Sequence, residues 1–395
     1  MPPSTERLLR ELLARVDDEL PGAFALRRRL HAEPELSHVE HATSALIAEQ
    51  LPLASEPLAG TGRIVRIGPA GGAAVAVRAE LDALPLRERT GAPFSAGGEA
   101  MHACGHDVHM AALVALARAA QRLGDDLPVA LLAVFQPSEE AYPSGAELLA
   151  RELARAKPAA MLAAHVHPEL PWGSVALDAG AVNASSDSVE ITIDGQPSHA
   201  AYPHRGRDPV LAISQVVVAL HARVARAIDP LSPATLNVGI VQAGAIETAI
   251  PSQARARASL RAYRDADRET LRELVAEVVA GVASAHGCRG SVELIAGEPP
   301  LVNDSSIVAA ARELLAGAGL RLAPPWRSLG SDDFAFFGEL APLAMAFVGL
   351  AGAPGFAERP LHHPELLPPE ESVAAIARTQ AVLLVAATRT LGAAR

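Results

Sequence analysis

Two hydrophobic patterns alternate along residues 8–182. Short, unbroken apolar runs have the length of buried strands, and the segments between them repeat apolar residues every three or four positions, as amphipathic helices do. The predicted strands are 73–78, 129–135 and 159–165, and the predicted helices are 43–53, 109–123 and 145–155. Strands that alternate with helices predict an α/β fold with a mostly parallel sheet flanked by helices.

The order of elements changes between residues 183 and 297. The predicted elements are a strand at 188–194, a helix at 208–228, strands at 235–241 and 254–262, a helix at 267–286 and a strand at 291–295. This β-α-β-β-α-β order is typical of a ferredoxin-like α+β domain. We therefore expect a small domain at 183–297, inserted into a larger domain formed by 1–182 and 298–395. The returning segment adds a strand at 344–350 and a helix from residue 371.

Composition and charge restrict the partners of the protein. The chain has 395 residues, of which half are hydrophobic, and this is enough for two packed cores. Its formal net charge is −11 and no run of basic residues is present. Nucleic acids and anionic membranes select for clustered lysine and arginine, so we expect neither as a partner.

The cysteines and the apolar segments indicate the compartment. Cys104 and Cys288 are the only cysteines, so we expect no disulfide framework, which fits a reducing cytoplasm. Residues 8–16 place leucines at helical spacing between charges, which predicts an amphipathic helix and not a signal peptide. The longest uncharged apolar run, 127–135, is about half of the roughly 20 residues that a membrane span requires. We expect a soluble, cytoplasmic protein.

The segment Met101-His102-Ala103-Cys104-Gly105-His106-Asp107 carries the most informative chemistry. It places a thiol and an imidazole two residues apart, where a strand pattern gives way to a helix. Other metal-binding residue types follow apolar runs elsewhere in the chain: Glu139, Glu140, His165 and His362. Thiolate, imidazole and carboxylate ligands together suit zinc or a similar divalent ion. Because open α/β sheets bind ligands at the carboxyl ends of their strands, we expect these residues to meet there.

Nine ordered blocks of the chain resemble the M20 metallopeptidase family, in particular its branch of aminoacylases, hippurate hydrolases and hydrolases of indole-acetyl amino acids. The blocks are LHAEPELS (30–37), RAELDALPL (78–86), MHACGHDVH (101–109), FQPSEE (135–140), HVHPELPWG (165–173), GQPSHAAYPHRGRDP (195–209), IPSQARARASLRA (250–262), GSDDFAFF (330–337) and LHHPEL (361–366). The resemblance implies a zinc-exopeptidase-like catalytic domain, with the inserted domain as lid and dimerisation unit. It also implies a homodimer.

The resemblance implies a site for two divalent ions such as Zn, Mn, Co or Ni. The implied ligands, one of which bridges the ions, are Cys104, His106, Glu140, His165 and His362. His167 and His363 are the neighbouring alternatives in their blocks. A lone cysteine would usually be a small buried hydrophobic residue, but Cys104 stands two residues from His106 and within a matching block.

Glu139 and Glu140 are expected to have different roles, because adjacent side chains project to different sides of an extended backbone. Glu140 would hold a metal, and Glu139 would act as general base toward the attacking hydroxide and as general acid toward the leaving amine. Two solvated glutamates are the alternative. Asp82 matches an aspartate that orients a ligand or the catalytic glutamate. Asp107 would orient His106, cap the following helix, or do both.

Four residues of the inserted domain are expected to reach the substrate. His199 in GQPSHAA matches a histidine that stabilises the oxyanion in the partner subunit's site, although a histidine that only shapes a turn is the alternative. A substrate carboxylate calls for an arginine, for which Arg261 is the first candidate and Arg205 the second. Thr248 stands where relatives commonly carry a substrate-contacting asparagine.

The predicted activity is the metal-dependent hydrolysis of the amide bond of N-acyl amino acids or short peptides. Alternatives on the same site are a ureido or carbamoyl substrate, or a carboxypeptidase or dipeptidase activity. An alternative from another class is a non-catalytic metal-binding or scaffold protein, which the presence of Glu139 disfavours. Glu80 and Asp332 replace residues that the family usually has as Asp and Glu, and these differences, with Thr248, bear on specificity.

Overall fold

The computed structural model describes residues 5–393, which form two compact units. The first unit runs to Gly180 and continues in Val302–Trp326 and from Phe336 onward. The second unit consists of Ala181–Leu301 and Arg327–Ala335. The short segment Arg327–Ala335 therefore packs with the second unit, whereas the sequence analysis assigned it to the larger domain.

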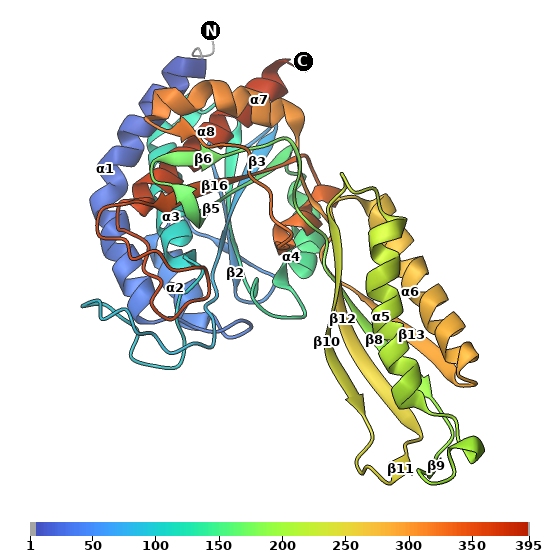
Figure 1. Ribbon diagram of the computed structural model, residues 1–395. Coiled ribbons are helices and arrows are strands. Elements are labelled where there is room, and N and C mark those ends of the chain that lie inside the picture. Colours follow the sequence, from blue (N-terminus) through green and yellow to red (C-terminus); the bar gives the residue numbers. More distant parts are fainter. Residues whose placement is uncertain (1–4, 394–395) are drawn as a thin grey trace. The chain divides into compact units, whose positions relative to one another are not determined.

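The first unit contains a mixed, mostly parallel sheet (Figure 1). Its main path has the order β1-β2-β4-β3-β5-β16-β14, where β1 is Glu56–Leu58, β2 Gly62–Ile67, β4 Ala130–Gln136, β3 Ala74–Glu80, β5 Ala160–Pro171, β16 Leu343–Ala351 and β14 Leu301–Asn303. Strands β4, β3, β5, β16 and β14 are parallel, and β2 is antiparallel to β4. Two short strands, β6 (Ser174–Ala176) and β15 (Arg321–Leu322), pair beside β16. The predicted α/β fold is confirmed.

Alternate residues of the strands pack into one apolar core. The helices of the unit are α1 (Thr5–Ala32), α2 (His41–Gln50), α3 (His106–Leu123), α4 (Gly145–Leu153), α7 (Ser305–Leu314) and α8 (Ser372–Ala393). Val77, Phe135, Val166 and Val348 are buried in this core together with apolar residues of α1, α3, α7 and α8. Because side chains alternate along a strand, Arg78, Glu80, Gln136, His165 and Phe347 point to the other face of the sheet.

Helix α3 begins three residues earlier than predicted, because its first turn is polar and lacks the apolar periodicity that the prediction used. The turn begins after Gly105, whose φ is +87°. A Cβ at Gly105 would lie 2.5 Å from Cγ2 of Val166, so both the backbone conformation and the close approach require glycine. Gly105 thus brings the first turn of α3 against β5.

The second unit is a ferredoxin-like domain. Its elements are β8 (Asp187–Asp194), α5 (Pro209–Ala227), β10 (Ala234–Ala243), β12 (Gln253–Ala262), α6 (Asp265–Ala285) and β13 (Arg289–Ala296). They form an antiparallel sheet of order β10-β12-β8-β13, as the β-α-β-β-α-β pattern predicts. Strand β7 (Gly180–Asn183) leads into this unit, and β9 (Ser198–His199) pairs with β11 (Ala249–Ile250).

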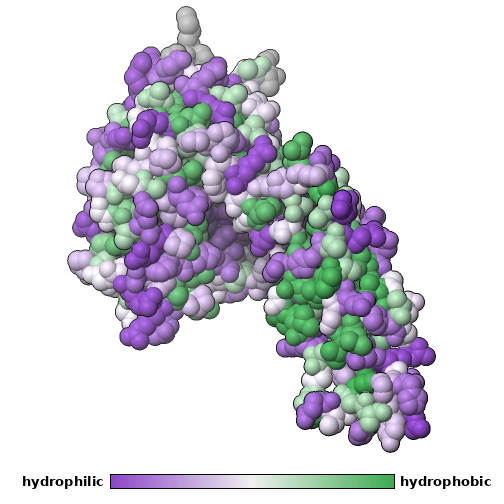
Figure 2. Space-filling view, viewed as in Figure 1, coloured by the Kyte–Doolittle hydropathy of each residue, from purple (hydrophilic) through white to green (hydrophobic). Residues whose placement is uncertain are grey.

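Helix α5 presents apolar side chains on two sides. Ile213 and Val216 are fully buried in the core of the second unit, whereas Leu211 and Val218 are exposed. Among the residues that the structure describes, α5 is the one helix that is long and apolar enough to cross a membrane, by length and composition only. Its 19 residues make it longer than the apolar run at 127–135. Figure 2 shows apolar surface gathered on this unit.

Candidate metal centre

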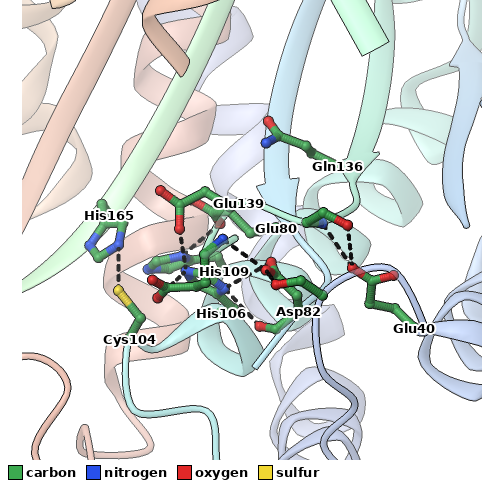
Figure 3. A network of polar contacts seen from close by, with 12 residues as sticks. Glu40, Glu80, Asp82, Cys104, His106, His109, Gln136, Glu139 and His165 are labelled. Carbon is green, nitrogen blue, oxygen red and sulfur yellow. Dashed lines mark hydrogen bonds and ion pairs between the residues drawn. The ribbon is translucent and has the colours of Figure 1, made fainter. Parts of the chain in front are cut away.

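The five predicted ligands come together on the first unit. One atom each of Cys104, His106 and Glu140 lies within 4.8 Å of the others. Nε2 of His165 lies 3.4 Å from Sγ of Cys104, and the two side chains point toward one another (Figure 3). Nε2 of His362 lies 3.3 Å from Oε1 of Glu140. The cluster draws on the first turn of α3, the loops after β4 and before α8, and strand β5.

Hydrogen bonds orient two of the histidines as metal ligands. Nδ1 of His165 donates to the carbonyl oxygen of Val166 at 2.6 Å, and Nδ1 of His106 donates to the carbonyl oxygen of Asp82 at 2.8 Å. A carbonyl oxygen can only accept, so Nδ1 carries the hydrogen in both rings. In the neutral imidazoles Nε2 then has a free lone pair, directed at the cluster.

Two buried polar atoms of the cluster make no hydrogen bond. Nε2 of His106 and Oε1 of Glu140 lie 3.9 Å apart, and both are inaccessible to solvent. Burying such groups without hydrogen-bond partners is costly, and natural structures rarely do so. A divalent cation between them would satisfy both, so the residues present fit a metal ion.

The electrostatics of the cluster also fit a cation. Burial, reinforced by Glu140 and Glu139, raises the pKa of the Cys104 thiol well above its usual range. Burial alone would lower the pKa of His106, but Glu80 and Asp82 outweigh it and raise this pKa to about 10. Both groups therefore hold protons that a metal would displace on binding. Burial lowers the pKa of His165, which keeps its imidazole neutral as a ligand must be.

His362 and His165, not the neighbouring histidines, face the cluster. His362 has a left-handed backbone (φ +65°), and its N–H donates to the carbonyl oxygen of Ala103 at 2.8 Å. Nδ1 of His363 instead accepts from the N–H of Glu365 within its own loop. His167 contacts the rings of Trp326 and Phe347 instead.

The loop that carries Glu139 and Glu140 is fixed by two buried carboxylates. Glu40 accepts from the N–H of Ser138 at 2.8 Å, and Asp82 accepts from the N–H of Glu140 at 2.9 Å. Ser138 has a φ of +53°, so the chain turns here and is not extended. Both glutamates consequently approach Nε2 of His106, Glu139 at 3.8 Å and Glu140 at 3.9 Å. The backbone at this point is therefore a turn and not the extended chain that the prediction assumed, and the different roles of the two glutamates stay a prediction.

Asp82 lies beside two of the predicted ligands, Glu140 and His106, which agrees with the first of its two predicted roles, the orientation of a ligand. Its Oδ2 accepts from Glu140 N–H and from the Ser37 hydroxyl at 2.7 Å, and its Oδ1 lies 3.6 Å from Nδ1 of His106. Burial would raise the pKa of Asp82, but these contacts outweigh it and lower the pKa to about 2. Asp82 is therefore a permanent anion behind the ligands.

Glu80 and His109 form a second buried pair behind the ligands. Nε2 of His109 accepts from the N–H of Val166 at 3.0 Å, so its Nδ1 carries the hydrogen and donates to Glu80 at 2.9 Å. With both nitrogens engaged, His109 is excluded as a ligand although its ring is within reach of the cluster. Arg78 balances the charge of Glu80 and lowers the pKa of this buried carboxyl.

Asp107 contacts α1 and not the residues that were predicted as its partners. Its Oδ2 accepts from Nε of Arg27 at 2.7 Å and from Nδ1 of His31 at 2.9 Å, and the residue at the N-cap position of α3 is Gly105. Nε2 of His31 lies 3.1 Å from Glu88. A histidine between two carboxylates donates from both nitrogens and is charged. Neither His31 nor Glu40 stands in a sequence pattern that shows its partner, so no role was predicted for either residue.

The predicted residues of the inserted domain lie on the second unit. His199 is exposed on β9, and its Nδ1 accepts from the N–H of Ala201 at 3.0 Å, which leaves Nε2–H as a donor. Thr248 accepts from Ala200 N–H through its backbone carbonyl. Arg261 donates to the carbonyl oxygen of Leu329 at 2.9 Å. The fourth predicted residue in this unit, Arg205, lies 5.1 Å from the centroid of the Tyr202 ring.

Comparisons with known proteins identify the family. Residues 76–385 match the model of peptidase family M20/M25/M40. An N-acetyl-L-cysteine deacetylase of Bacillus subtilis (strain 168) is 33% identical over 358 residues, covering 89% of this chain and 84% of the relative. An N-acetyldiaminopimelate deacetylase of Bacillus licheniformis is 32% identical over 365 residues, covering 90% and 96%.

A solved structure agrees with this similarity. The crystal structure of a Bacillus subtilis protein, described as a dinuclear metal binding peptidase from the M20 family, superposes with a TM-score of 0.81. It is 28% identical, and the match covers 93% of this chain and 98% of that one. The fold and the sequence thus point to the same family.

The charge of His31 leads to a prediction about stability and pH. Burial would lower the pKa of His31, but Asp107 and Glu88 raise it from 6.5 to about 9. Its contribution to stability is therefore complete below about pH 6.5 and lost as the pH rises toward 9. We expect His31→Gln to lower the free energy of unfolding, and we expect this loss to be smaller at pH 9 than at pH 6 by on the order of 3 kcal/mol. Urea unfolding of metal-loaded protein measures both values.

The control for this measurement is His41→Gln, which changes an exposed histidine at the first residue of α2. Its effect on unfolding should be small, because the side chain is exposed. A destabilisation by His31→Gln that stayed constant from pH 6 to 9 would contradict a charged His31.

Proposed function

The chain belongs to peptidase family M20/M25/M40 and is a hydrolase of amide bonds, and on this premise we propose that its substrates are N-acyl amino acids. The observation that carries the proposal is the position of Glu139. This carboxylate lies 3.8 Å from the Nε2 of His106 that would hold a metal, while the neighbouring Glu140 belongs to the ligand cluster. A cluster that only stabilised the fold would not require this extra carboxylate.

The ligands, Glu139 and Asp82 have different roles in the proposed reaction. Two divalent ions, held by Cys104, His106, Glu140, His165 and His362, would supply activated water and polarise the scissile carbonyl. Zn, Mn, Co and Ni all suit this mixed ligand set. Glu139 takes the proton of the attacking water and returns it to the amine that leaves. Asp82 holds the backbone of Glu140 and the ring of His106 in place for this transfer.

The amino-acid part of the substrate carries a carboxylate, for which the second unit offers arginines. Odd-numbered residues of β12 lie on the sheet face away from the helices, and they include Arg255, Arg257 and Arg261. Arg257 is paired with Glu190 at 3.1 Å. We therefore retain Arg261 as the carboxylate-binding residue and Arg205 as the alternative, with Thr248 as a further substrate contact.

We also propose that the protein is a homodimer assembled through the second unit. Leu211 and Val218 on α5 and Val241 on β10 expose more than half of their surface, although each is a large apolar residue. A second copy of the chain would cover this surface in a two-fold arrangement. His199, exposed and with Nε2–H free to donate, would then stabilise the oxyanion in the site of the other subunit.

The proposed compartment is the cytoplasm. Cys104 and Cys288 are both free thiols, and Cys104 must stay reduced to bind a metal.

A substrate screen tests the function directly. Metal-loaded protein should hydrolyse N-acetyl, N-benzoyl or long-chain N-acyl amino acids, and dialysis against a chelator should abolish this activity until Zn, Mn, Co or Ni is restored. Preference for dipeptides or ureido acids, assayed in parallel, would select one of the alternative activities. Full activity in protein shown to be free of metal would refute the mechanism.

Substitutions of the two glutamates separate their roles. Glu139→Gln should lower kcat by about 10²–10⁴, the usual contribution of general acid–base catalysis, with the metal content unchanged. Glu140→Gln is the matched control, and it should lose metal, measured by mass spectrometry. The reverse pattern would show that the two roles are exchanged.

Mixed dimers test whether His199 acts on the partner subunit. His199→Ala and Glu139→Gln should each be nearly inactive, but a mixed dimer would contain one site in which both residues are wild type. After statistical subunit exchange, activity should recover to about a quarter of wild type per total subunit. If labelled subunits exchange and no activity returns, His199 acts within its own subunit or only shapes its loop.

A further inference from the structure

Two residues of the first unit that contact each other have a left-handed backbone, although neither is glycine. His38 precedes helix α2 with a φ of +69°, and Ser138 in the loop after β4 has a φ of +53°. The left-handed region is unfavourable for residues with a Cβ, and such strain persists only where the surrounding structure imposes it. The N–H of His38 donates to the hydroxyl of Ser138 at 2.8 Å, although 100 positions separate the two residues. A contact between distant segments therefore maintains both strained conformations.

The carboxylate of Glu40 joins these two residues. Its Oε1 accepts from the N–H of Ser138 at 2.8 Å, from the hydroxyl of Ser138 at 3.1 Å and from the N–H of His38 at 3.1 Å. Its Oε2 accepts from the hydroxyl of Thr61 at 2.7 Å. Glu40 is completely buried, and burying a carboxylate is costly unless its oxygens are hydrogen-bonded. These bonds offset the cost and fix the side chain, which belongs to the same polar network as Asp82 (Figure 3).

The place of Glu40 in the sequence would suit a different role. Glu40 directly precedes helix α2, where a side-chain acceptor usually bonds to the first N–H groups of the helix. The side chain of Glu40 makes no such bond, and Glu35 instead accepts from the N–H of Thr43 at 2.7 Å. Glu40 is directed away from its own helix toward Ser138, 98 residues further along the chain. Its buried carboxylate thus acts on the loop after β4 and not on α2.

The loop after β4 carries the reactive carboxylate of the proposed reaction. Ser138 is followed directly by Glu139, whose Oε2 lies 3.8 Å from Nε2 of His106. Asp82 holds the other side of the loop, where it accepts from the N–H of Glu140 at 2.9 Å. Glu139 therefore stands between two anchored N–H groups, those of Ser138 and Glu140. Because φ and ψ are the soft angles of the backbone, a change at Ser138 would turn Glu139 away from this place.

We propose that Glu40 is a positioning residue, which places the general base Glu139 by holding Ser138 in its left-handed conformation. The proposal rests on the proposed amide hydrolysis, in which Glu139 transfers the proton. A catalytic group that is misplaced by about 1 Å can lower the rate about 100-fold. Glu40 does not act on the substrate itself, and its whole effect passes through Ser138.

The kinetic test compares two glutamates of the same segment. Glu40→Met keeps the length of the side chain but removes both acceptor oxygens. In metal-loaded protein it should lower kcat about 100-fold for an N-acyl amino acid that the substrate screen identifies, with KM changed less than about threefold. Glu35→Met is the matched control, because Glu35 bonds to α2 and not to Ser138, and its kcat should change less than about threefold. The metal content, measured by mass spectrometry, should be the same in both variants.

Conservative variants extend this test. Glu40→Gln keeps one carbonyl oxygen for Ser138 and directs its amide N–H₂ to the hydroxyl of Thr61, so it should restore most of kcat. Glu40→Asp keeps the buried charge but is one methylene shorter, so it should lower kcat about tenfold even if Glu40→Met does not fold. Equal losses of kcat in Glu40→Met and Glu35→Met, or a loss of metal in place of kcat, would assign Glu40 a merely structural role.

A second substitution at Ser138 tests the backbone mechanism. Glycine adopts the left-handed conformation without the strain that a Cβ causes, so Ser138→Gly should make Glu40 less necessary. In the Glu40→Met background, Ser138→Gly should raise kcat about tenfold, as expected for two coupled residues. Ser138→Ala is the matched control, because it removes the same hydroxyl but keeps the Cβ, and it should give no recovery. Equal recovery by Gly and Ala would overturn the proposed role of the backbone.

Crystal structures separate this proposal from the proposed function, because they require no catalysis. In metal-loaded Glu40→Met, the φ of Ser138 should leave the left-handed region, and Oε2 of Glu139 should move by about 1 Å or more relative to Nε2 of His106. In metal-loaded Glu35→Met, both should stay as they are. If Ser138 and Glu139 keep their places in Glu40→Met, the positioning role is refuted even if the protein hydrolyses N-acyl amino acids.

Discussion

Asp82 connects the two elements on which the metal centre depends. Its carbonyl oxygen accepts from the ring of His106 in α3, and its carboxylate accepts from the backbone of Glu140 in the loop after β4. One residue at the end of β3 thereby sets the distance between a nitrogen ligand and an oxygen ligand. The contacts that lower the pKa of Asp82 keep this connection anionic over the working pH range of an enzyme. Without it, Glu140 and His106 would have to be placed by separate interactions.

The site concentrates negative charge that the protein itself only partly balances. Arg78 neutralises Glu80, and Arg27 with His31 neutralises Asp107, so the carboxylates around the cluster are paired. Glu139 and Glu140 face the ligand cluster. There the raised pKa values of Cys104 and His106 keep protons on the thiol and the imidazole, and a metal ion would displace these protons. Metal binding and proton release are coupled for this reason. Arg27 and Arg78 thus compensate the buried carboxylates Asp107 and Glu80, which lie behind the cluster and not among its proposed ligands.

The proposed metal ligands and the proposed carboxylate-binding residues belong to different units of the chain. All five proposed ligands and Glu139 belong to the first unit, where register and hydrogen bonds fix them to a parallel sheet. The residues proposed to bind the substrate carboxylate belong to the ferredoxin-like unit. If Thr248 contacts the substrate as proposed, its replacement would change the substrate preference and leave the ligands in place. This separation is how one fold supports many related activities.

The sequence by itself determined the α/β class and the ferredoxin-like order of elements at 183–297, because both follow from local periodicity. The residues that meet at the metal centre were implied by blocks that resemble the family, such as MHACGHD. Tertiary structure alone decided the partners of the buried polar groups. Asp107 contacts Arg27, 80 residues away, and Glu40 fixes Ser138, 98 residues away. Nothing in a local pattern encodes such pairs, since each depends on which surfaces meet after folding. The turn at Ser138, which places both glutamates beside His106, likewise depends on a bond that only the folded chain can form.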